Sequence, residues 1–345
     1  MKAIRAHSFG GPNVLQLEDI ADPIPGPGEI VIDVRAAGVN PADTYMRNGT
    51  YAIVPPLPYI PGGDAGGVVS AIGADVHTAS IGDPVFVGTA LSFDLTGCYA
   101  EKVKRKASEV LPLPSGVSFA AAAAFGVSYT TAHYSLFERG GGRAGETVFI
   151  HGASGSVGTS AIQLAKRAGL KVIGSGGTAR GLELIIKEGA DHAVDHTKKG
   201  YLDKVKVVTG GKGPELILEM LANVNLAADM DIAAKYGRIV VIGNRGDITI
   251  NPRVAMMKEL DIRGIALWNV KPKLVAPMMK DILAGVASGD LRPIIGREMP
   301  LAEAAKAHVE VLQPGALGRV DGFDKHNGAS EADKCGEGRL GFVAP

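Results

Sequence analysis

The stretch that decides the fold runs from residue 146 to residue 169 and reads Glu146-Thr-Val-Phe-Ile-His-Gly-Ala-Ser-Gly-Ser-Val-Gly-Thr-Ser-Ala-Ile-Gln-Leu-Ala-Lys-Arg-Ala-Gly169. Its apolar start, Thr147 to Ile150, predicts a buried parallel strand, and from Val157 the apolar residues recur at helical spacing. Between them lies the turn Ala153-x-Gly155-x-x-Gly158. Such glycines let a pyrophosphate approach the backbone and let the helix pack on the strand, while the helix N-terminus offers unpaired N–H groups. A glycine-rich loop alone is more often a plain turn, but the flanking strand and helix favour a dinucleotide-binding turn.

Five more short apolar runs follow this turn and alternate with stretches of helical periodicity. The runs are Val172-Ile173, His192-Ala193-Val194, Leu216-Ile217-Leu218, Ile239-Val240-Val241-Ile242 and Ile262 to Leu267. Together with the first strand they make six, a number and spacing typical of a doubly wound parallel sheet with right-handed crossovers. The sequence therefore predicts an α/β protein with a Rossmann domain over residues 125–267.

The residues before this domain carry short β patterns between Pro and Gly turns. We expect strands at Ala3 to His7, Val14 to Glu18, Ile30 to Ala37, Gly67 to Ile72, Pro84 to Val87 and Tyr99 to Val103. Residues 1–124 are therefore predicted to form a β-rich domain, and an Ala-rich helix from Phe119 to Phe137 is expected to link it to the next. Residues 268–320 have helical periodicity and are expected to return to the β-rich domain. The polar, glycine-rich residues 321–345 are typical of a tail that packs no core.

The composition argues against several classes of function. Lys plus Arg and Asp plus Glu each number 36 among the 345 residues, and aromatic residues make up 5%, so no basic track for nucleic acid is indicated. Cys98 and Cys335 are too few for a disulfide framework or a thiolate cluster. The sequence has no run of about 18 apolar residues and no apolar core of a signal peptide at its start. We therefore expect a cytoplasmic protein without a membrane segment, whose partners are small molecules or its own copies.

The residues after the second predicted strand indicate which dinucleotide binds. A fold that prefers NAD places Asp or Glu about 20 residues beyond the glycine turn to accept the ribose hydroxyls. No carboxylate stands in the segment 172–180. Ser175, Thr178 and Arg180 instead offer hydrogen-bond donors and a positive charge, which suit a 2′-phosphate. NADPH is therefore the predicted cofactor, although Arg180 could also be a solvated residue at a helix start.

Several longer motifs resemble one known family. They are Phe9-Gly-Gly-Pro-Asn-Val-Leu15, Ala37-Gly-Val-Asn-Pro-Ala-Asp-Thr-Tyr-Met-Arg-Asn-Gly-Thr-Tyr51, Pro58-Tyr-Ile-Pro-Gly-Gly-Asp-Ala-Gly-Gly67, His151-Gly-Ala-Ser-Gly155 and Glu219-Met-Leu-Ala-Asn-Val-Asn-Leu226. From residue 1 to about residue 320 the chain resembles the medium-chain dehydrogenase/reductase superfamily, and within it the zinc-free quinone oxidoreductases of the zeta-crystallin type. The resemblance implies a GroES-like β-rich catalytic domain and a Rossmann domain, with nicotinamide and substrate meeting in the cleft between them.

The resemblance also bears on metals. Zinc-dependent members of the superfamily carry a metal-ligand Cys where this chain has Asn40, and Gly-His-Glu where it has Gly62-Gly63-Asp64. A catalytic zinc needs three protein ligands, usually thiolate and imidazole, and a structural zinc needs four. The histidines of this chain are scattered without ligand spacing. We therefore predict no metal site.

The resemblance implies roles for individual residues. The expected donors to the substrate and neighbours of the nicotinamide are Asn40, Tyr45, Tyr51 and Thr131, with Tyr59 and Asp64 as weaker candidates. The residues expected to bind the cofactor through the turn and the loops beyond it are Ala153, Ser154, Gly155, Ser156, Val157, Gly158, Asn223, Gly243, Asn244 and Arg245. His196 lies where relatives often contact the 2′-phosphate and could share that role with Arg180. The plainer alternatives are cleft-wall packing for Tyr45 and Tyr51 and a turn-forming carboxylate for Asp64.

These residues favour one kind of substrate. Without a Lewis acid the developing alkoxide of a carbonyl–alcohol interconversion has no cation to hold it, whereas a quinone spreads its charge over a conjugated oxygen that a few donors can stabilise. We therefore predict an NADPH:quinone oxidoreductase, and leave open whether hydride or single electrons are transferred. The rivals are an NADPH-dependent 2-alkenal or enone reductase and a low-turnover NADPH-binding protein of a crystallin-like or RNA-binding kind. A homo-oligomer is expected, with the sixth Rossmann strand at a sheet edge that could pair with its copy.

The C-terminal end departs from the family pattern. Family members end soon after a Gly-Ala-x-Gly-Lys/Arg turn with a hydrophobic last strand, but here Arg319-Val320 runs straight into Asp321 and the polar tail. Either the sheet lacks one strand or the terminal Leu340-Gly-Phe-Val-Ala344 replaces it. A reading-frame error in the source sequence would also explain the abrupt change.

Overall fold

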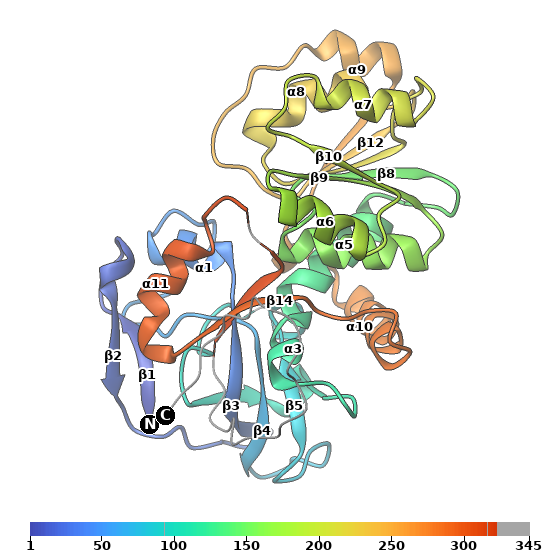
Figure 1. The fold of residues 1–345 in the computed structure, drawn as a ribbon. Helices are drawn as coiled ribbons and strands as arrows, with labels where there is room; N and C mark the ends of the chain where they lie inside the picture. Colours follow the sequence, from blue (N-terminus) through green and yellow to red (C-terminus); the bar gives the residue numbers. More distant parts are fainter. Residues whose placement is uncertain (93, 316, 323–345) are drawn as a thin grey trace. The chain divides into compact units, whose positions relative to one another are not determined.

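The structure, a computed structural model, describes residues 1–322 apart from residues 93 and 316 and is organised as two units (Figure 1). Among the described residues, the first comprises Met1–Val127, Pro293–Gln313 and Arg319–Gly322, and the second comprises Ser128–Arg292 and Pro314–Gly318. The return to the first unit thus begins at residue 293 and not at residue 268. The reason is helix α10 (Pro272–Ala287), which contacts α4 (Thr130–His133) of the second unit and buries Met278, Met279 and Ile282.

The second unit is built on a six-stranded parallel sheet. Its strands are β8 (Thr147–Ile150), β9 (Lys171–Gly176), β10 (His192–Asp195), β11 (Leu216–Glu219), β12 (Arg238–Val241) and β13 (Asp261–Gly264). Their order, β10-β9-β8-β11-β12-β13, is that of a doubly wound dinucleotide-binding sheet. The predicted Rossmann fold is confirmed, and its sixth strand lies at the edge as expected, although β13 ends at Gly264 rather than at residue 267.

Helices cover both faces of this sheet. They are α5 (Ser156–Arg167), α6 (Ala179–Lys187), α7 (Tyr201–Val208), α8 (Ala222–Ile232) and α9 (Pro252–Lys258). Figure 1 shows α5 and α6 on one face and α7, α8 and α9 on the other, which agrees with the contacts of each helix. Because both faces are covered, the central strands are buried: all four residues of β11, including Glu219 at its end, are buried. The core includes Phe149, Ile173, Ile217 and Ile239 of neighbouring strands.

The first unit is β-rich, as predicted. Its strands are β1 (Lys2–Ala6), β2 (Leu15–Asp19), β3 (Glu29–Val39), β4 (Ala65–Ile72), β5 (Pro84–Val87), β6 (Lys102–Lys106), β7 (Val110–Pro112), β14 (Ile295–Met299) and β15 (Arg319–Gly322). Its helices are α1 (Pro41–Arg47), α2 (Thr89–Ser92), α3 (Phe119–Ala123) and α11 (Ala304–Glu310). The main sheet has the order β14-β15-β3-β4-β5-β7, β6 pairs with β3 outside this path, and β1 and β2 form a separate pair.

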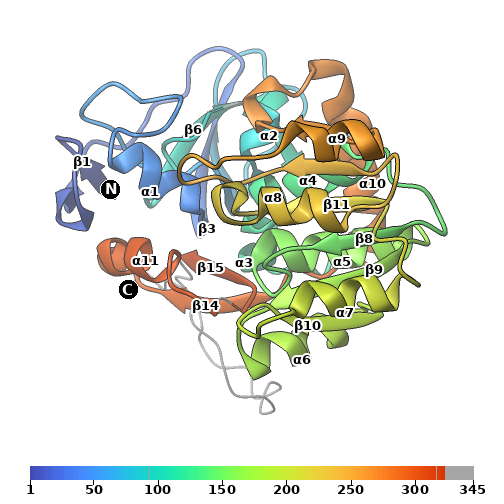
Figure 2. The same ribbon diagram turned by 90° about the horizontal axis from the view of Figure 1, so that it is seen from above.

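Two expectations about this unit need correction. The strand expected at Tyr99 to Val103 forms three residues later, as β6, because Tyr99 and Ala100 pair their backbones with Ile4 and Ala3 instead of with β3. The sheet also does not lack its last strand: Arg319–Gly322 forms β15, which pairs antiparallel with β3 and parallel with β14 (Figure 2). Backbone pairing is enough for this strand, so the polar Asp321 does not prevent it. The alternative strand at residues 340–344 lies outside the described residues.

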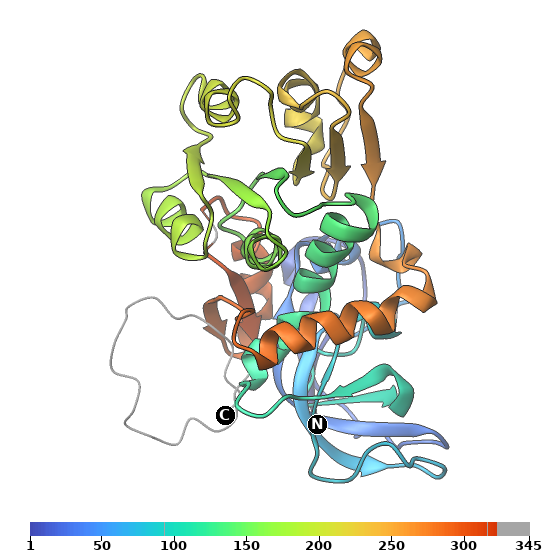
Figure 3. The same ribbon diagram turned by 90° about the vertical axis from the view of Figure 1, so that its right-hand side faces the viewer.

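The helices agree with the sequence in two further ways. The segment from Phe119 to Arg139 is helical almost throughout, in alternating α and π turns, as the Ala-rich pattern predicted. Helix α10 has 16 residues, and it is the long orange helix of Figure 3. Within the described part of the chain, no helix combines the length and the hydropathy that a bilayer crossing requires.

Candidate functional site

The glycine turn after β8 has the backbone that a pyrophosphate site needs. Gly152 adopts a positive φ of 54°, and Gly155 is the N-cap of α5, whose first N–H groups face away from the helix. A Cβ on Gly158 would lie 2.5 Å from Cα of Ala153 and 2.6 Å from the carbonyl oxygen of Gly152. Residue 158 must therefore be glycine for the helix to approach the strand this closely. The backbone of the turn suits a dinucleotide phosphate, and its role in binding stays a prediction.

The loops that follow β11 and β12 lie together. They are next to the point between β8 and β11 where the strand order reverses, which is where doubly wound sheets bind their ligands. The backbone N–H of Ala222 donates to the carbonyl of Gly243 at 2.9 Å, and the N–H of Arg245 donates to Oδ1 of Asn223 at 2.9 Å. A Cβ on Gly243 would lie 2.2 Å from the carbonyl oxygen of Met220. The structure thus brings Asn223 and the segment 243–245 together, as the resemblance implied.

The residues expected to recognise a 2′-phosphate lie in different surroundings. Ser175 is fully buried, and its Oγ accepts from the N–H of Gly152 at 3.3 Å, so it supports the glycine turn and is not placed to contact a phosphate. Thr178 is the N-cap of α6 and accepts from the N–H of Gly181 at 3.1 Å, while Arg180 is exposed in the first turn of that helix. His196, which follows β10, reaches the same edge.

The His196 ring packs on a glycine of this edge. A Cβ on Gly177 would lie 2.7 Å from its Nε2, so a side chain at residue 177 would displace the ring from the end of β9. Partial burial lowers the pKa of His196, and the neighbouring His151 lowers it further. The imidazole is therefore mostly neutral at pH 7, and Arg180 is the fixed positive charge of this edge.

A second glycine turn reaches the same edge and was not expected there. The N–H of Gly318 donates to the carbonyl of Ser154 at 2.8 Å, and a Cβ on Gly315 would lie 3.1 Å from Cγ2 of Thr178. The sequence marks the segment 314–318 as a turn, but its spacing gives no hint that it packs beside residues 154 and 178. Only the path of the chain back through the second unit shows this.

Three titratable side chains are buried together in the second unit. His151 directly follows β8, Glu219 ends β11, and Asp229 lies on α8. Nε2 of His151 lies 2.7 Å from Oδ1 of Asp229 and 3.3 Å from Oε2 of Glu219. We call these three residues the acid cluster. The histidines are scattered in the sequence without ligand spacing, so the sequence gave no sign of this cluster.

Burial sets the protonation of the acid cluster. It raises the pKa of Glu219 and of Asp229, and it lowers the pKa of His151. The ligand-type atoms of the three side chains lie within 4.8 Å of one another, close enough to share a cation or a proton. Because both acid pKa values are raised, we expect the cluster to hold protons. Oε1 of Glu219 also accepts from the N–H of Leu221 and from Nδ2 of Asn225, so the cluster anchors the first turn of α8.

In the first unit, strand β3 delivers Asn40 to the start of α1. Asn40 is the N-cap of this helix and forms a capping box with Asp43, whose carboxylate accepts from the N–H of Asn40 at 2.8 Å. Asp43 also accepts from the hydroxyl of Tyr99 at 3.1 Å. The hydrogen bond from its backbone N–H to Asp43 thus holds the predicted substrate donor Asn40 in place.

The support for Asp43 continues into α11. Nη1 of Arg47 lies 3.3 Å from Nδ1 of His308, and Nε2 of His308 lies 3.2 Å from the hydroxyl of Tyr99. Burial, followed by the charge of Arg47, lowers the pKa of His308 to about 3, so the ring is neutral. Because arginine can only donate, Nδ1 accepts and Nε2 carries the proton. The donation therefore runs in one direction, from Arg47 through His308 and Tyr99 to Asp43.

Asp64 follows a tight turn before β4 and has no exposed surface. Its carboxylate accepts four hydrogen bonds: one at 3.1 Å from Nδ2 of Asn40, two from the backbone and hydroxyl of Thr89 at 3.1 and 3.4 Å, and one at 3.1 Å from the N–H of Val127. The sequence suggested a turn-forming carboxylate as the plainer interpretation of Asp64. The structure shows instead a buried group that joins β4, α2 and the segment after α3 to Asn40.

Tyr45 and Tyr51, also expected near the substrate, lie together in the same unit. Both are partly buried, and their ring centroids are 6.3 Å apart. Burial, with smaller effects from Asp43 and Tyr45, raises the pKa of Tyr51 to about 12, so its hydroxyl is a donor at neutral pH. Tyr59 is a core residue whose hydroxyl is buried, and Thr131 lies on α4 of the second unit and is 5% exposed.

The residues around Asn40 do not fit a catalytic zinc. The amide of Asn40 and the carboxylate of Asp64 hydrogen-bond to each other, and Gly62 and Gly63 offer no ligand atom in between. Cys98 is buried and lies 3.7 Å from Nη2 of Arg105. Among the described residues of the first unit, no three His, Cys, Asp or Glu side chains gather closely enough to hold an ion. The absence of a metal from the whole chain stays a prediction.

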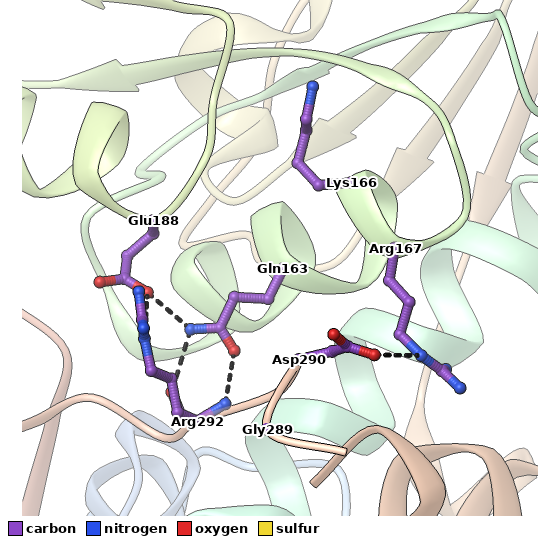
Figure 4. Close-up of a pocket in the computed structure, with 7 residues that line it drawn as sticks. All are labelled: Gln163, Lys166, Arg167, Glu188, Gly289, Asp290 and Arg292. Atoms are coloured by element: carbon purple, nitrogen blue, oxygen red, sulfur yellow. Dashed lines mark hydrogen bonds and ion pairs between the residues drawn. The ribbon is translucent and has the colours of Figure 1, made fainter.

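A polar pocket of about 370 Å³ opens beside the C-terminal half of α5 (Figure 4). It is lined by Gln163, Lys166, Arg167, Glu188, Gly289, Asp290 and Arg292. Arg167 lies 3.6 Å from Asp290, and Arg292 lies 3.6 Å from Glu188, which also accepts from Gln163 at 2.7 Å. These groups are matched within the protein, so we assign the pocket no part in binding the dinucleotide.

Comparisons with known proteins agree with this geometry. Residues 26–115 match the model of the alcohol dehydrogenase GroES-like domain, and residues 156–283 match that of the zinc-binding dehydrogenases. The quinone oxidoreductase of Sus scrofa is 42% identical over 93% of this chain and 97% of its own length. The GroES-like and Rossmann folds expected from the sequence are therefore confirmed.

Two solved structures share the fold over nearly their whole length. The quinone oxidoreductase of Escherichia coli, complexed with NADPH, has a TM-score of 0.80 and 28% identity over 92% of this chain and 99% of its own. An NAD-dependent alcohol dehydrogenase has a TM-score of 0.85 and 28% identity over 93% and 99%. The fold therefore indicates a nicotinamide dinucleotide without choosing between NAD and NADP. On the strength of the curated relative and both domain matches, this chain is an oxidoreductase of the medium-chain dehydrogenase/reductase superfamily and belongs to its quinone oxidoreductases.

Proposed function

We propose that this protein reduces quinones with NADPH as the reductant. The observation that carries the proposal is the pairing of Asn40 with Asp64, which puts an amide donor where zinc-dependent relatives have a metal ligand. A quinone oxygen needs such a donor more than it needs a cation, because its developing charge is spread by conjugation. The relatives named quinone oxidoreductase support the same substrate class.

The second unit would hold the cofactor. Ala153 to Gly158 would bind the pyrophosphate through backbone N–H groups and the start of α5, and Asn223 with residues 243–245 would contact the nicotinamide half. Thr178, Arg180 and His196 would contact the 2′-phosphate. When bound, NADPH supplies the reducing equivalents of the reaction. The part of the protein is to orient the substrate and to stabilise its oxygen.

The first unit would supply most of the substrate contacts. Asn40, Tyr45 and Tyr51 are hydrogen-bond donors there, and Thr131 is the corresponding group of the second unit. The pKa of Tyr51, raised to about 12, keeps its hydroxyl protonated so that it donates rather than repels a developing oxyanion. Removal of one such donor typically costs about 100- to 1000-fold in kcat.

NADPH oxidation with and without 1,2-naphthoquinone tests the reaction. We expect quinone-dependent oxidation that exceeds the rate with a medium-chain 2-alkenal. A faster rate with the 2-alkenal would make the protein an enone reductase. If the protein binds NADPH but oxidises it with neither acceptor, it is a low-turnover binding protein, and a salt-dependent RNA shift would then identify the RNA-binding alternative.

Cofactor preference is tested by the dissociation constants of NADPH and NADH. Arg180→Ala should weaken NADPH binding about 10-fold or more, the value of a hydrogen bond to a charged group, and should change NADH binding less than about twofold. Lys187→Ala is the matched control, because Lys187 is an exposed cation at the other end of α6. Equal losses of affinity for NADPH and NADH would mean that Arg180 does not contact the 2′-phosphate.

Two further properties remain proposals. We propose a homo-oligomer in which β13, the edge strand of the second unit, pairs with its copy; Ile262 of this strand is 39% exposed. Light scattering on the purified protein measures the mass, and a monomer would contradict the proposal. A cytoplasmic location is tested by cell fractionation.

A further inference from the structure

We propose that Asp64 is a positioning residue for Asn40, and that it decides which atoms of the Asn40 amide are available to a substrate. The inference rests on the proposed function, in which Asn40 donates to the substrate oxygen. It starts from the hydrogen bond of 3.1 Å between Nδ2 of Asn40 and Oδ2 of Asp64, two side chains that are 4% and 0% exposed.

The chemistry of the two groups allows one orientation of the amide. A carboxylate only accepts hydrogen bonds, so the amide must turn its NH₂ group toward Asp64 and its oxygen away from it. On the other side, the N–H of Asp43, which only donates, bonds to the backbone carbonyl of Asn40 at 3.0 Å, and the capping box places the Asn40 side chain toward the same N–H. The oxygen is therefore directed to the helix and the nitrogen to Asp64. One N–H of the amide is used by Asp64, and the other is the donor that we assign to the substrate.

The carboxylate that dictates this orientation is itself immobile. Both of its oxygens accept from groups fixed by the backbone, the N–H of Thr89 and the N–H of Val127. A Cβ on Gly126 would lie 1.9 Å from Oδ1 of Asp64, and one on Gly88 would lie 2.7 Å from Cα of Gly126. These two glycines bring the chain close enough for its N–H groups to enclose the carboxylate. Because its own carboxylate is fixed by the backbone, Asp64 holds the Asn40 side chain in one position.

A double-mutant cycle tests the proposal. The neutral variant Asp64→Asn can pair with Asn40 in either amide orientation, so the donor is no longer fixed toward the substrate. With 1,2-naphthoquinone and saturating NADPH, we expect Asp64→Asn to lower kcat about 10- to 100-fold and Asn40→Ala about 100-fold. If Asp64 acts through Asn40, adding Asp64→Asn to Asn40→Ala should change kcat less than about twofold. Losses that multiply would overturn the proposal.

The exchanged pair Asn40→Asp with Asp64→Asn separates positioning from stability. It restores an amide-to-carboxylate hydrogen bond, with the amide now at residue 64, so the melting temperature should recover relative to Asp64→Asn alone. The carboxylate at residue 40 has no N–H to donate, so kcat should stay low. Recovery of kcat together with the melting temperature would mean that Asp64 has a structural role only.

A measurement on the unaltered protein is independent of both folding of the variants and quinone turnover. In ¹H–¹⁵N spectra, the two Nδ2 protons of Asn40, assigned with Asn40→Ala, should have well separated shifts, and one should exchange slowly because it is bonded to a buried carboxylate. Two protons with equal shifts and fast exchange would contradict the proposal. If the protein reduces no quinone but shows the protected proton, the proposed substrate is wrong and the positioning by Asp64 stands.

Discussion

The two units each bury acidic side chains next to candidate functional residues, and they treat them in opposite ways. Asp64 of the first unit accepts four hydrogen bonds from fixed donors. In the acid cluster of the second unit, Glu219 and Asp229 hydrogen-bond to each other, and the buried Oε2 of Glu219 and Oδ2 of Asp229 accept no hydrogen bond from an N–H group of the described residues. Burial alone therefore does not decide the role of an acidic side chain. A carboxylate surrounded by donors fixes geometry, whereas two acids that face each other with too few donors keep protons instead.

The largest expected effect is the loss of the Asp64 carboxylate. Asp64→Ala leaves the N–H groups of Thr89 and Val127 and the amide of Asn40 buried without their acceptor. This should lower the free energy of unfolding of the first unit by about 3–5 kcal/mol. Urea unfolding followed by a probe of the first unit measures it. Asp19→Ala is the control, since its pair with Lys2 is exposed and should be worth under about 1 kcal/mol. If Asp64→Ala lowered the free energy of unfolding as little as Asp19→Ala does, the role assigned to the Asp64 carboxylate would be wrong.

The next effect concerns the acid cluster and depends on pH. Burial raises the pKa of Glu219 and that of Asp229 to about 7, from 4.5 and 3.8. The folded state therefore keeps protons that the unfolded chain releases, and the stability they contribute is complete below about pH 4 and is lost as the pH rises to 7. His151 acts in the opposite sense because its pKa is lowered, so it costs stability as the pH falls below 6.5. Burial, with smaller effects from Asp229 and Glu219, raises the pKa of the nearby Tyr201 to about 12, so this hydroxyl stays protonated over the same pH range.

Glu219→Gln should remove one of the two titrations. Glutamine keeps the Oε1 acceptor for Leu221 and Asn225, and its NH₂ group can donate to Asp229, so the fold is retained. At pH 8 we expect a gain of about 2 kcal/mol in the free energy of unfolding and no gain at pH 4, because one pKa unit corresponds to about 1.4 kcal/mol. Thermal melts from pH 4 to pH 8 test this. The exposed Glu183→Gln on α6 is the control, and a gain that is independent of pH would contradict the titration.

The smallest effect is expected at the support of Asp43. Tyr99→Phe removes the hydroxyl that donates to Asp43 and accepts from His308, but Asp43 keeps the N–H of Asn40. The cost should be about 1 kcal/mol, the net value of an ordinary buried hydrogen bond. The double mutant Tyr99→Phe with Asp64→Ala tests whether Asp43 and Asp64 act independently on Asn40. If Asp43 and Asp64 hold Asn40 independently, the two losses should add within about 0.5 kcal/mol.

Much of the fold and part of the site followed from local patterns. The turn from Ala153 to Gly158 was predictable because its glycines meet needs of the nearby backbone: at residue 158 a Cβ would collide with residues only five and six positions earlier. The place of Asn223 beside Arg245 was expected only through a family resemblance. The start of β6 and the unit to which α10 belongs were misjudged, since both depend on which distant segment competes for the same pairing.

The sequence by itself determined the alternation of strand and helix, the dinucleotide turn, the two kinds of domain and the candidate donors Asn40, Tyr45 and Tyr51, because these follow from periodicity, glycine spacing and recognisable motifs. Only the tertiary structure decided what surrounds each buried acid. The donors to Asp64 come from residues 40, 89 and 127, and the acid cluster joins residues 151, 219 and 229. The sequence writes Asp64 and Asp229 with the same letter. Whether a carboxylate orients a neighbour or holds a proton depends on how many N–H groups the fold brings within hydrogen-bonding distance.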